Sequence, residues 1–137
     1  MSHQFVVQLP NRPGELSHLA RALCARGVNI VQIQQTTAGD VTSAQIITDC
    51  CDDDTRDVLR GMGYPFVAHT NLTEEIEDTP CAFGEINDRL VASGVGLRGC
   101  CVIGRSGGVA TWAFAVDDEV RAREILGLAP VTEAVRS

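Results

Sequence analysis

The chain has 137 residues, 45% of them hydrophobic and 21% charged, which is a globular composition large enough for one ordinary domain or two very small ones. Its net charge is −7 and no cluster of Lys or Arg occurs, so a nucleic-acid-binding or anionic-membrane surface is not expected, because neither would gain its usual electrostatic attraction. Only 4% of the residues are aromatic, so Val, Ile, Leu and Ala must build most of the core.

The N-terminus and the cysteines favour a cytoplasmic protein. The first residues lead straight into a strand-like segment without the basic and apolar regions of a signal peptide, and no apolar run is long enough to cross a bilayer. Six cysteines are present, four of them in two adjacent pairs: Cys24, Cys50, Cys51, Cys81, Cys100 and Cys101. Adjacent cysteines do not bridge easily, so we expect free thiols in a reducing compartment.

An internal repeat organises the chain, because a shift of 67 positions lays the sequence onto itself without a gap for most of its length. Identities are few, but turn residues and apolar residues coincide: Pro13 with Pro80, Leu23 with Leu90, Gly27 with Gly94, Ile30 with Leu97, and Ile47 with Phe114. The sequence therefore predicts two repeats, residues 1–69 and 70–137. No Gly-, Ser- or Pro-rich linker lies near Thr70, so we expect the repeats to be docked and not loosely tethered.

The first repeat has the pattern strand, helix, strand, strand, helix, strand. Alternating apolar residues predict a strand over residues 5–9, and an apolar stripe from Leu16 to Cys24 predicts a helix that Gly27 ends. The other predicted elements are strands 28–36 and 41–49 around a turn at 38–40, a helix that opens with the aspartates at 52–54 and ends at Gly63, and a short strand 65–69.

The second repeat follows the same plan. Its predicted elements are strand 72–76, helix 80–92, strands 95–104 and 109–116, helix 117–126, and a last strand within 130–134. An antiparallel sheet with helices on one face leaves its other face and its edges uncovered, and a homodimer can cover them.

The segment with the most informative chemistry joins the first strand to the first helix. Pro13 fixes φ for a helix start and Gly14 leaves the surface bare of a side chain, so the first N–H groups of the helix point outward without partners and suit a carboxylate. The ammonium end of an amino acid needs acceptors, which Asn11 and the start of the next strand, Asn29 and Ile30, are placed to supply. A Pro-Gly helix start is also a common way to turn a corner, with Asn11 serving only as a cap, and these residues alone leave both interpretations open.

These residues resemble the signature of ACT domains, ferredoxin-like βαββαβ modules that bind amino acids and regulate metabolic enzymes. The matching motifs are Asn11-Arg12-Pro13-Gly14-Glu15-Leu16 and Gly27-Val28-Asn29-Ile30. The duplication is similar to stand-alone tandem ACT proteins, and it implies an α+β fold of two such repeats, with antiparallel sheets and helices on one face. In the family the amino acid lies at the first strand-to-helix loop, often at an interface between two modules, which implicates Asn11, Arg12, Pro13, Gly14, Glu15, Leu16, Asn29 and Ile30.

The second repeat departs from the family pattern. Its equivalent segment is Asp78-Thr79-Pro80-Cys81-Ala82-Phe83, and Gly96 stands in place of Asn29. Cys81 replaces the family glycine, so its side chain would intrude where a ligand should approach. Asp78 brings negative charge toward a carboxylate, although in related modules an Asp here can meet the ammonium group. We expect the second site to be weakened, altered or mainly structural.

Other clusters do not indicate a metal or a cofactor. Cys50-Cys51 and Cys100-Cys101 lack CxxC spacing, and adjacent side chains in a strand face opposite sides, so neither pair can readily hold one ion. The acidic run 49–54 lacks the alternating ligands of a calcium loop and suits a helix start instead. Trp112 matches Gln45 under the shift, which leaves a module interface and core packing equally open.

Three functions compete. The leading hypothesis is a non-catalytic regulatory sensor that binds a free amino acid, without cofactor or metal, as a homodimer. The alternative is a regulatory subunit or docking module for an amino-acid biosynthetic enzyme, similar to the small subunits of acetolactate synthase. The third is an enzyme that uses Cys81 as a nucleophile, because the N-terminus of a helix favours a thiolate.

Overall fold

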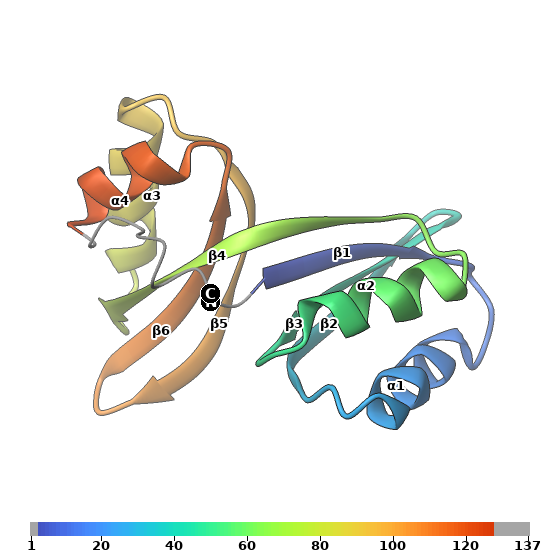
Figure 1. Cartoon of the computed structure of the whole chain (residues 1–137). Helices are drawn as coiled ribbons and strands as arrows, with labels where there is room; N and C mark the ends of the chain where they lie inside the picture. The colour runs from blue at the N-terminus through green and yellow to red at the C-terminus, as the bar shows by residue number, and fades with distance from the viewer. Residues whose placement is uncertain (1–2, 128–137) are drawn as a thin grey trace. The chain divides into compact units, whose positions relative to one another are not determined.

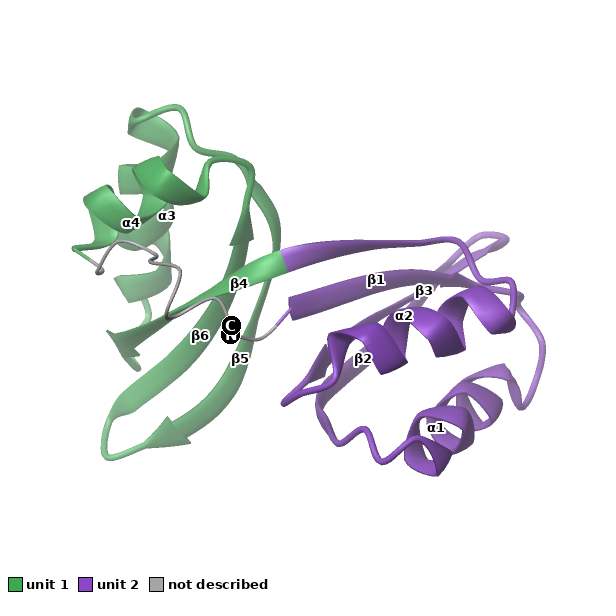
Figure 2. Ribbon diagram, viewed as in Figure 1, with its two compact units in different colours: residues 1, 70–137 green, residues 2–69 purple. Residues whose placement is uncertain are grey.

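The computed structural model describes residues 3–127, which divide into two compact units between His69 and Thr70 (Figures 1 and 2). We call residues 3–69 the N-terminal unit and residues 70–127 the C-terminal unit. No helix within the described range is long and apolar enough to cross a membrane.

The N-terminal unit is an antiparallel sheet with two helices. Its elements are β1 (His3–Leu9), α1 (Glu15–Ala25), β2 (Ile30–Ala38), β3 (Val41–Thr48), α2 (Asp52–Gly61) and the start of β4 (Phe66–Glu77). The strands lie in the order β2-β3-β1-β4, so β2 is an edge strand and β3 pairs antiparallel with both β1 and β2. Gly27 and Gly63 follow α1 and α2 with φ of +73° and +74°, the left-handed conformation that ends a helix at low steric cost.

The core of the N-terminal unit lies between one face of its sheet and both helices. Alternate residues of β1, Phe5 and Val7, are fully buried there with Leu19 and Leu23 of α1 and Leu59 of α2. Because successive strand residues face opposite sides, this alternation assigns both helices to the same face of the sheet. Figure 1 shows α1 and α2 on that face.

The C-terminal unit repeats the plan from the second part of β4 onward. Its further elements are α3 (Ala82–Ala92), β5 (Leu97–Ser106), β6 (Val109–Val116) and α4 (Glu119–Leu126), with the strands in the order β4-β6-β5. Leu72, Leu90 and Phe114 are buried at its centre. Trp112 packs against this core and stacks on Phe83, with 4.4 Å between the ring centroids, so core packing is its role within this unit.

The predicted α+β class with its repeated βαββαβ pattern is confirmed, and the deviations are local. The two short strands expected over 65–69 and 72–76 are one continuous strand, β4, because the sequence between them has no Gly or Pro to end it and Asn71 pairs with Ala115 of β6. β2 begins at Ile30 and not at residue 28, because Val28 is buried in the core as part of the turn after α1. The last strand predicted within 130–134 lies outside the described residues.

Candidate functional site

The loop between β1 and α1 ends at Gly14, which is the N-cap of α1 and has φ of +88°. The loop is held by backbone hydrogen bonds, since the Arg12 N–H donates to the Pro10 carbonyl (2.9 Å) and the His18 N–H donates to the Gly14 carbonyl (2.9 Å). A Cβ added at Gly14 would meet no atom within 4 Å, so the glycine is required by its backbone conformation and not by crowding. The space above it is open.

Within residues 3–127, no side chain caps the N-terminus of α1. The alternative in which Asn11 serves as a cap is therefore wrong, and Asn11 is exposed. Among the described residues we find no acceptor for the N–H groups of Leu16 and Ser17 in the first turn. Unpaired N–H groups at the positive end of a helix dipole can donate hydrogen bonds to a carboxylate, which is the chemistry expected at this position.

Glu15, in the first turn of α1, accepts hydrogen bonds from two side chains. Arg12 Nη2 lies 2.7 Å from one carboxylate oxygen, and the Tyr64 hydroxyl lies 2.5 Å from the other. The hydrogen bond from Tyr64 is the main cause that lowers the pKa of Glu15, with a further contribution from the Arg12 charge. Burial, followed by the same hydrogen bond, raises the pKa of Tyr64 to about 12. Glu15 is thus held ionised and oriented beside the helix N-terminus.

A cavity of about 470 Å³ lies beside this loop. Its lining combines the loop, α1 and the turn between α2 and β4: Pro10, Arg12, Glu15, His18, Ala22, Gly61, Met62, Gly63 and Tyr64. Both signs of charge are present, with the Arg12 guanidinium and the Glu15 carboxylate on the same wall. The sequence prediction missed Tyr64, although β4 begins at the end of the sheet where β1 finishes, so the turn before it must pass close to the β1–α1 loop.

Asn29 and Ile30 do not join this loop within one unit. Leu9 at the end of β1 is level with Thr42 of β3, whereas Ile30 is level with Thr48. Six residues along a strand correspond to about 20 Å, so the two predicted parts of the site lie at opposite ends of the sheet.

The Asn29 side chain is instead tied to the loop after β3. Its amide donates to the Asp49 carboxylate (3.1 Å), and the Asp49 N–H donates to the Asn29 carbonyl (3.3 Å). These bonds fix the turn after α1 against the loop that precedes α2.

The equivalent loop of the C-terminal unit has the same hydrogen bonds but a different backbone at one position. The Thr79 N–H donates to Glu77 (2.9 Å) and the Glu85 N–H to Cys81 (3.1 Å), which reproduces the bonds of the first loop under the shift of 67. Cys81, however, has φ of −102°, where Gly14 has +88°. Asp78 forms an ion pair with Arg105, with 3.0 Å between Asp78 Oδ2 and Arg105 Nε.

Gly96, at the position equivalent to Asn29, is another difference between the two repeats. Its N–H donates to the Asp117 carboxylate (2.9 Å), and a Cβ at this position would lie 2.7 Å from Asp117 Oδ2. An asparagine like Asn29 could fit here only if Asp117 moved. The C-terminal unit therefore cannot offer a side-chain amide at this place as it stands.

The cysteines differ from the sequence prediction at one pair. Cys50 and Cys51 form a disulfide, so the expectation that all six thiols are free is wrong there. These two residues lie in a loop and not in a strand, so their side chains are not forced to opposite sides. The other four cysteines form no disulfide within residues 3–127: Cys24, Cys81, Cys100 and Cys101. Within residues 3–127 no group of His, Cys, Asp and Glu side chains is arranged to hold a metal ion.

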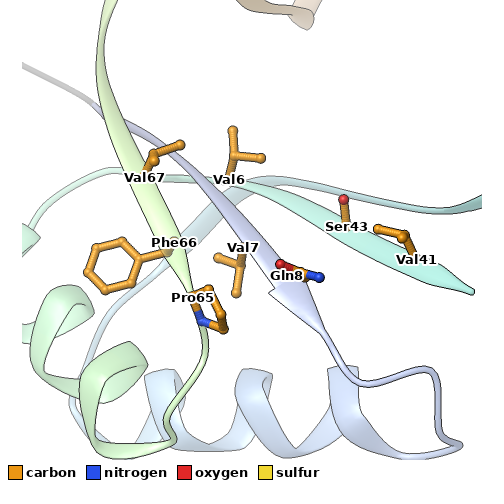
Figure 3. A pocket seen from close by; sticks show the side chains of 8 residues that line it. All are labelled: Val6, Val7, Gln8, Val41, Ser43, Pro65, Phe66 and Val67. Carbon is orange, nitrogen blue, oxygen red and sulfur yellow. The ribbon is translucent and has the colours of Figure 1, made fainter.

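A second hollow of about 350 Å³ crosses β1, β3 and the start of β4 (Figure 3). Its lining is Val6, Val7, Gln8, Val41, Ser43, Pro65, Phe66 and Val67, with no ionisable side chain. Val6 and Val67 point away from the helices in Figure 3, whereas Val7 and Phe66 pack toward the core. This hollow offers no charge to a zwitterion and contains none of the predicted ligand-binding residues.

The Tyr64–Glu15 pair predicts an unusual alkaline titration. The chain contains a single tyrosine, so its near-ultraviolet phenolate absorbance reports Tyr64 alone, and we expect a midpoint near pH 12. Because the folded pKa is raised above the ordinary value of 10.0, the stability that Tyr64 contributes is complete below pH 10 and is lost as the pH rises toward 12. Glu15→Gln should lower the midpoint without returning it to the ordinary value, because burial remains. A midpoint near 10 in folded wild-type protein, with folding checked by circular dichroism, would contradict the pair.

One family model matches part of the chain. The family model for the ACT domain matches residues 3–60, a stretch that runs from β1 almost to the end of α2. The match is a single one and does not extend into the C-terminal unit. No curated protein sequence matches the chain.

Several solved structures share the fold over most of the chain. A protein from Bacteroides thetaiotaomicron has a TM-score of 0.75 at 17% identity, covering 91% of this chain and 85% of that one. The ligand-free regulatory subunit of aspartate kinase from Thermus thermophilus has a TM-score of 0.65 at 14% identity, covering 92% and 87%, and that from Thermus flavus has 0.67 at 14%, covering 92% and 90%. The chain thus shares the fold of these proteins nearly from end to end, and its residues 3–60 match the ACT domain.

Proposed function

We propose that this chain is a non-catalytic regulatory protein that binds a free amino acid at the β1–α1 loop of its N-terminal unit. The observation that carries the proposal is the uncapped N-terminus of α1, which opens beside a cavity holding one basic and one acidic side chain. The match of residues 3–60 to the ACT domain supports the same site.

The charges of an amino acid suit this loop. The ligand carboxylate would accept hydrogen bonds from the N–H groups of Leu16 and Ser17 and would attract Arg12. The ligand ammonium would take the place of Arg12 beside the Glu15 carboxylate, which Tyr64 keeps ionised and oriented. A bound amino acid would therefore replace the exposed Arg12–Glu15 ion pair with two ion pairs, one between its carboxylate and Arg12 and one between its ammonium and Glu15. No charge would be left unpaired.

A homodimer would complete the site, because Asn29 and Ile30 lie at the far end of the sheet from the loop. The edge strand β2 offers the means, since its sequence, IVQIQQTTA, contains no charge and no proline. β5, the edge strand of the C-terminal unit, carries Arg98 and Arg105 and two register shifts against one in β2, features that discourage edge pairing. Antiparallel pairing of β2 with a second copy would bring the partner's Ile30 level with Ala38, at the end of the sheet where the β1–α1 loop lies.

A second candidate function is a regulatory subunit or docking module of an amino-acid biosynthetic enzyme. Its support is the structural likeness to the aspartate kinase regulatory subunit, of which this chain covers 87%. The two functions are compatible, since a regulatory subunit can also bind an amino acid. Stable co-purification with a biosynthetic enzyme would favour the second, and a protein that is always a lone dimer would count against it.

The amino-acid site predicts a selective stabilisation in a thermal-shift screen of the twenty amino acids. At a concentration ten times Kd, a ligand stabilises the folded state by about 1.4 kcal/mol, which raises Tm by several degrees. We expect one amino acid, or a chemically related group, to do this in wild-type protein and to lose the effect in Gly14→Trp.

Two further variants distinguish steric blocking of the ligand site from backbone strain at Gly14. In Gly14→Ala the left-handed backbone destabilises the folded state by roughly 1 kcal/mol, so Tm should fall. The added Cβ meets no atom within 4 Å, so the rise in Tm on adding ligand should remain. Cys81→Trp places the same bulk at the equivalent position of the C-terminal unit and should also keep the shift. A flat screen on wild type, or a shift that survives Gly14→Trp, would contradict the site.

If two copies pair through β2, a single charged residue introduced into this strand should weaken the dimer. Gln34 is the middle residue of β2, so in a symmetric antiparallel pair two lysines introduced by Gln34→Lys would face one another. We expect sedimentation equilibrium to give a dimer for wild type and a Kd raised at least about tenfold for Gln34→Lys. Ser106→Lys, on the exposed edge strand β5, is the matched control and should leave Kd unchanged. A monomeric wild type, or an unaffected Gln34→Lys dimer, would rule out this edge.

A further inference from the structure

The loop between β3 and α2 contains one residue more than its counterpart between β6 and α4. The loops are Asp49-Cys50-Cys51 and Asp117-Asp118. The first residue of each makes the same backbone bond, from Asp49 to the Asn29 carbonyl (3.3 Å) and from Asp117 to the Gly96 carbonyl (3.1 Å). The last residue of each is the N-cap of the following helix. Cys50 is therefore the additional residue, and it is bonded to the cap residue Cys51.

The two caps have different conformations. Asp118 is extended, with φ of −132°, and its carboxylate accepts a hydrogen bond from the Arg121 N–H (3.0 Å), which is an ordinary helix cap. Cys51 has φ of +69° and gives α2 no side-chain cap. Among residues 3–127 it is the one residue other than glycine with positive φ. Such a backbone is strained for a residue with a side chain and persists only where the surroundings impose it.

The second adjacent pair shows that proximity in sequence does not by itself produce the bond. Cys100 and Cys101 lie within β5, level with Phe114 and Ala113 of β6, and no disulfide joins them. In a paired strand their side chains face opposite sides, whereas the extra loop residue allows Cys50 and Cys51 to meet. Cys100 and Cys101 therefore serve as an unbridged internal control for the bridged pair Cys50–Cys51.

We propose that Cys50–Cys51 is a reversible redox site that small or protein dithiols reduce. Cys50 is exposed and Cys51 is partly buried against the core, so a thiolate of the dithiol attacks the Cys50 sulfur. The S–S bond breaks, its electron pair leaves on the Cys51 sulfur, and that sulfur takes a proton. The second thiolate of the reductant then attacks the mixed disulfide and releases Cys50, which is protonated in turn. The pair gains two electrons and two protons, and the dithiol loses them as it becomes a disulfide.

Reduction changes the loop that holds Asn29. Once the bond is broken, Cys51 is free to take the extended conformation that Asp118 has at the equivalent cap. Asp49, two residues earlier, would move with the loop, and its carboxylate and N–H are the partners of Asn29. α2 stays attached to α1, because Arg26 pairs with Asp54 at 2.6 Å and Asp57 at 3.5 Å. The redox chemistry stands independently of ligand binding, and only an effect on ligand affinity through Asn29 rests on the proposed function.

The first experiment measures which cysteines change state. Native protein is equilibrated with graded ratios of reduced to oxidised dithiothreitol, quenched in acid and alkylated, and each cysteine peptide is quantified by mass spectrometry. We expect Cys50 and Cys51 to convert together in one two-electron transition, while Cys100 and Cys101 stay reduced throughout. A pair that is reduced at every ratio, a pair that is never reduced, or Cys100 and Cys101 oxidising at the same ratio would overturn the proposal.

The second experiment measures the structural consequence by backbone amide NMR on both redox states. The Asn29 and Asp49 signals should shift on reduction, and the equivalent Gly96 and Asp117 signals should not. In Cys50→Ser/Cys51→Ser the same dithiol should change none of the four. Unchanged Asn29 and Asp49 signals in wild type, after a reduction that mass spectrometry confirms, would overturn the coupling. Neither experiment contains an amino acid, so failure here is distinct from failure of the amino-acid site.

Discussion

The left-handed backbone of Gly14 is the constraint on which the candidate site depends. With φ of +88°, it ends the β1–α1 loop and starts α1 without a capping side chain, so the first N–H groups of the helix stay open beside the cavity. A residue with a side chain would take this conformation only at a cost, although no neighbouring atom would obstruct its Cβ. The glycine therefore serves the conformation of the loop, and the open helix end follows from it.

The two units have the same architecture but differ in what surrounds the equivalent loop. At Cys81 the backbone is right-handed, Asp78 is paired with Arg105, and Gly96 leaves no room for an amide like that of Asn29. Phe83, at the position of Leu16, stacks on Trp112 in the second core. These differences favour packing at the loop of the C-terminal unit, whereas the β1–α1 loop of the N-terminal unit stays open.

Much of this fold could be predicted from the spacing of apolar residues and from the residues that begin and end helices and turns. The apolar stripe before Gly27 and the aspartates at 52–54 placed α1 and α2 correctly, because helix ends depend on local residues. The strand break predicted near Thr70 was wrong, because this segment has no Gly or Pro to end the strand and Asn71 pairs with Ala115 of β6.

The site was less predictable, because it depends on contacts between distant segments. The loop residues were found from the sequence, but Tyr64 reaches Glu15 from a turn 49 residues further along the chain. Asn29 was expected beside the loop, whereas the register of β3 puts it at the other end of the sheet. The Cys50–Cys51 bond was missed because adjacent cysteines were expected to diverge as they do in a strand, whereas these two lie in the loop after β3.

The most direct test of the central claim is a backbone amide NMR titration of the full chain with the amino acid selected by the thermal-shift screen. If the ligand carboxylate binds the open end of α1, the Leu16 and Ser17 signals should shift most and saturate together. The equivalent Phe83 and Gly84 signals of the C-terminal unit should stay in place. Saturable shifts centred elsewhere, with Leu16 and Ser17 unchanged, would contradict this account of the molecule.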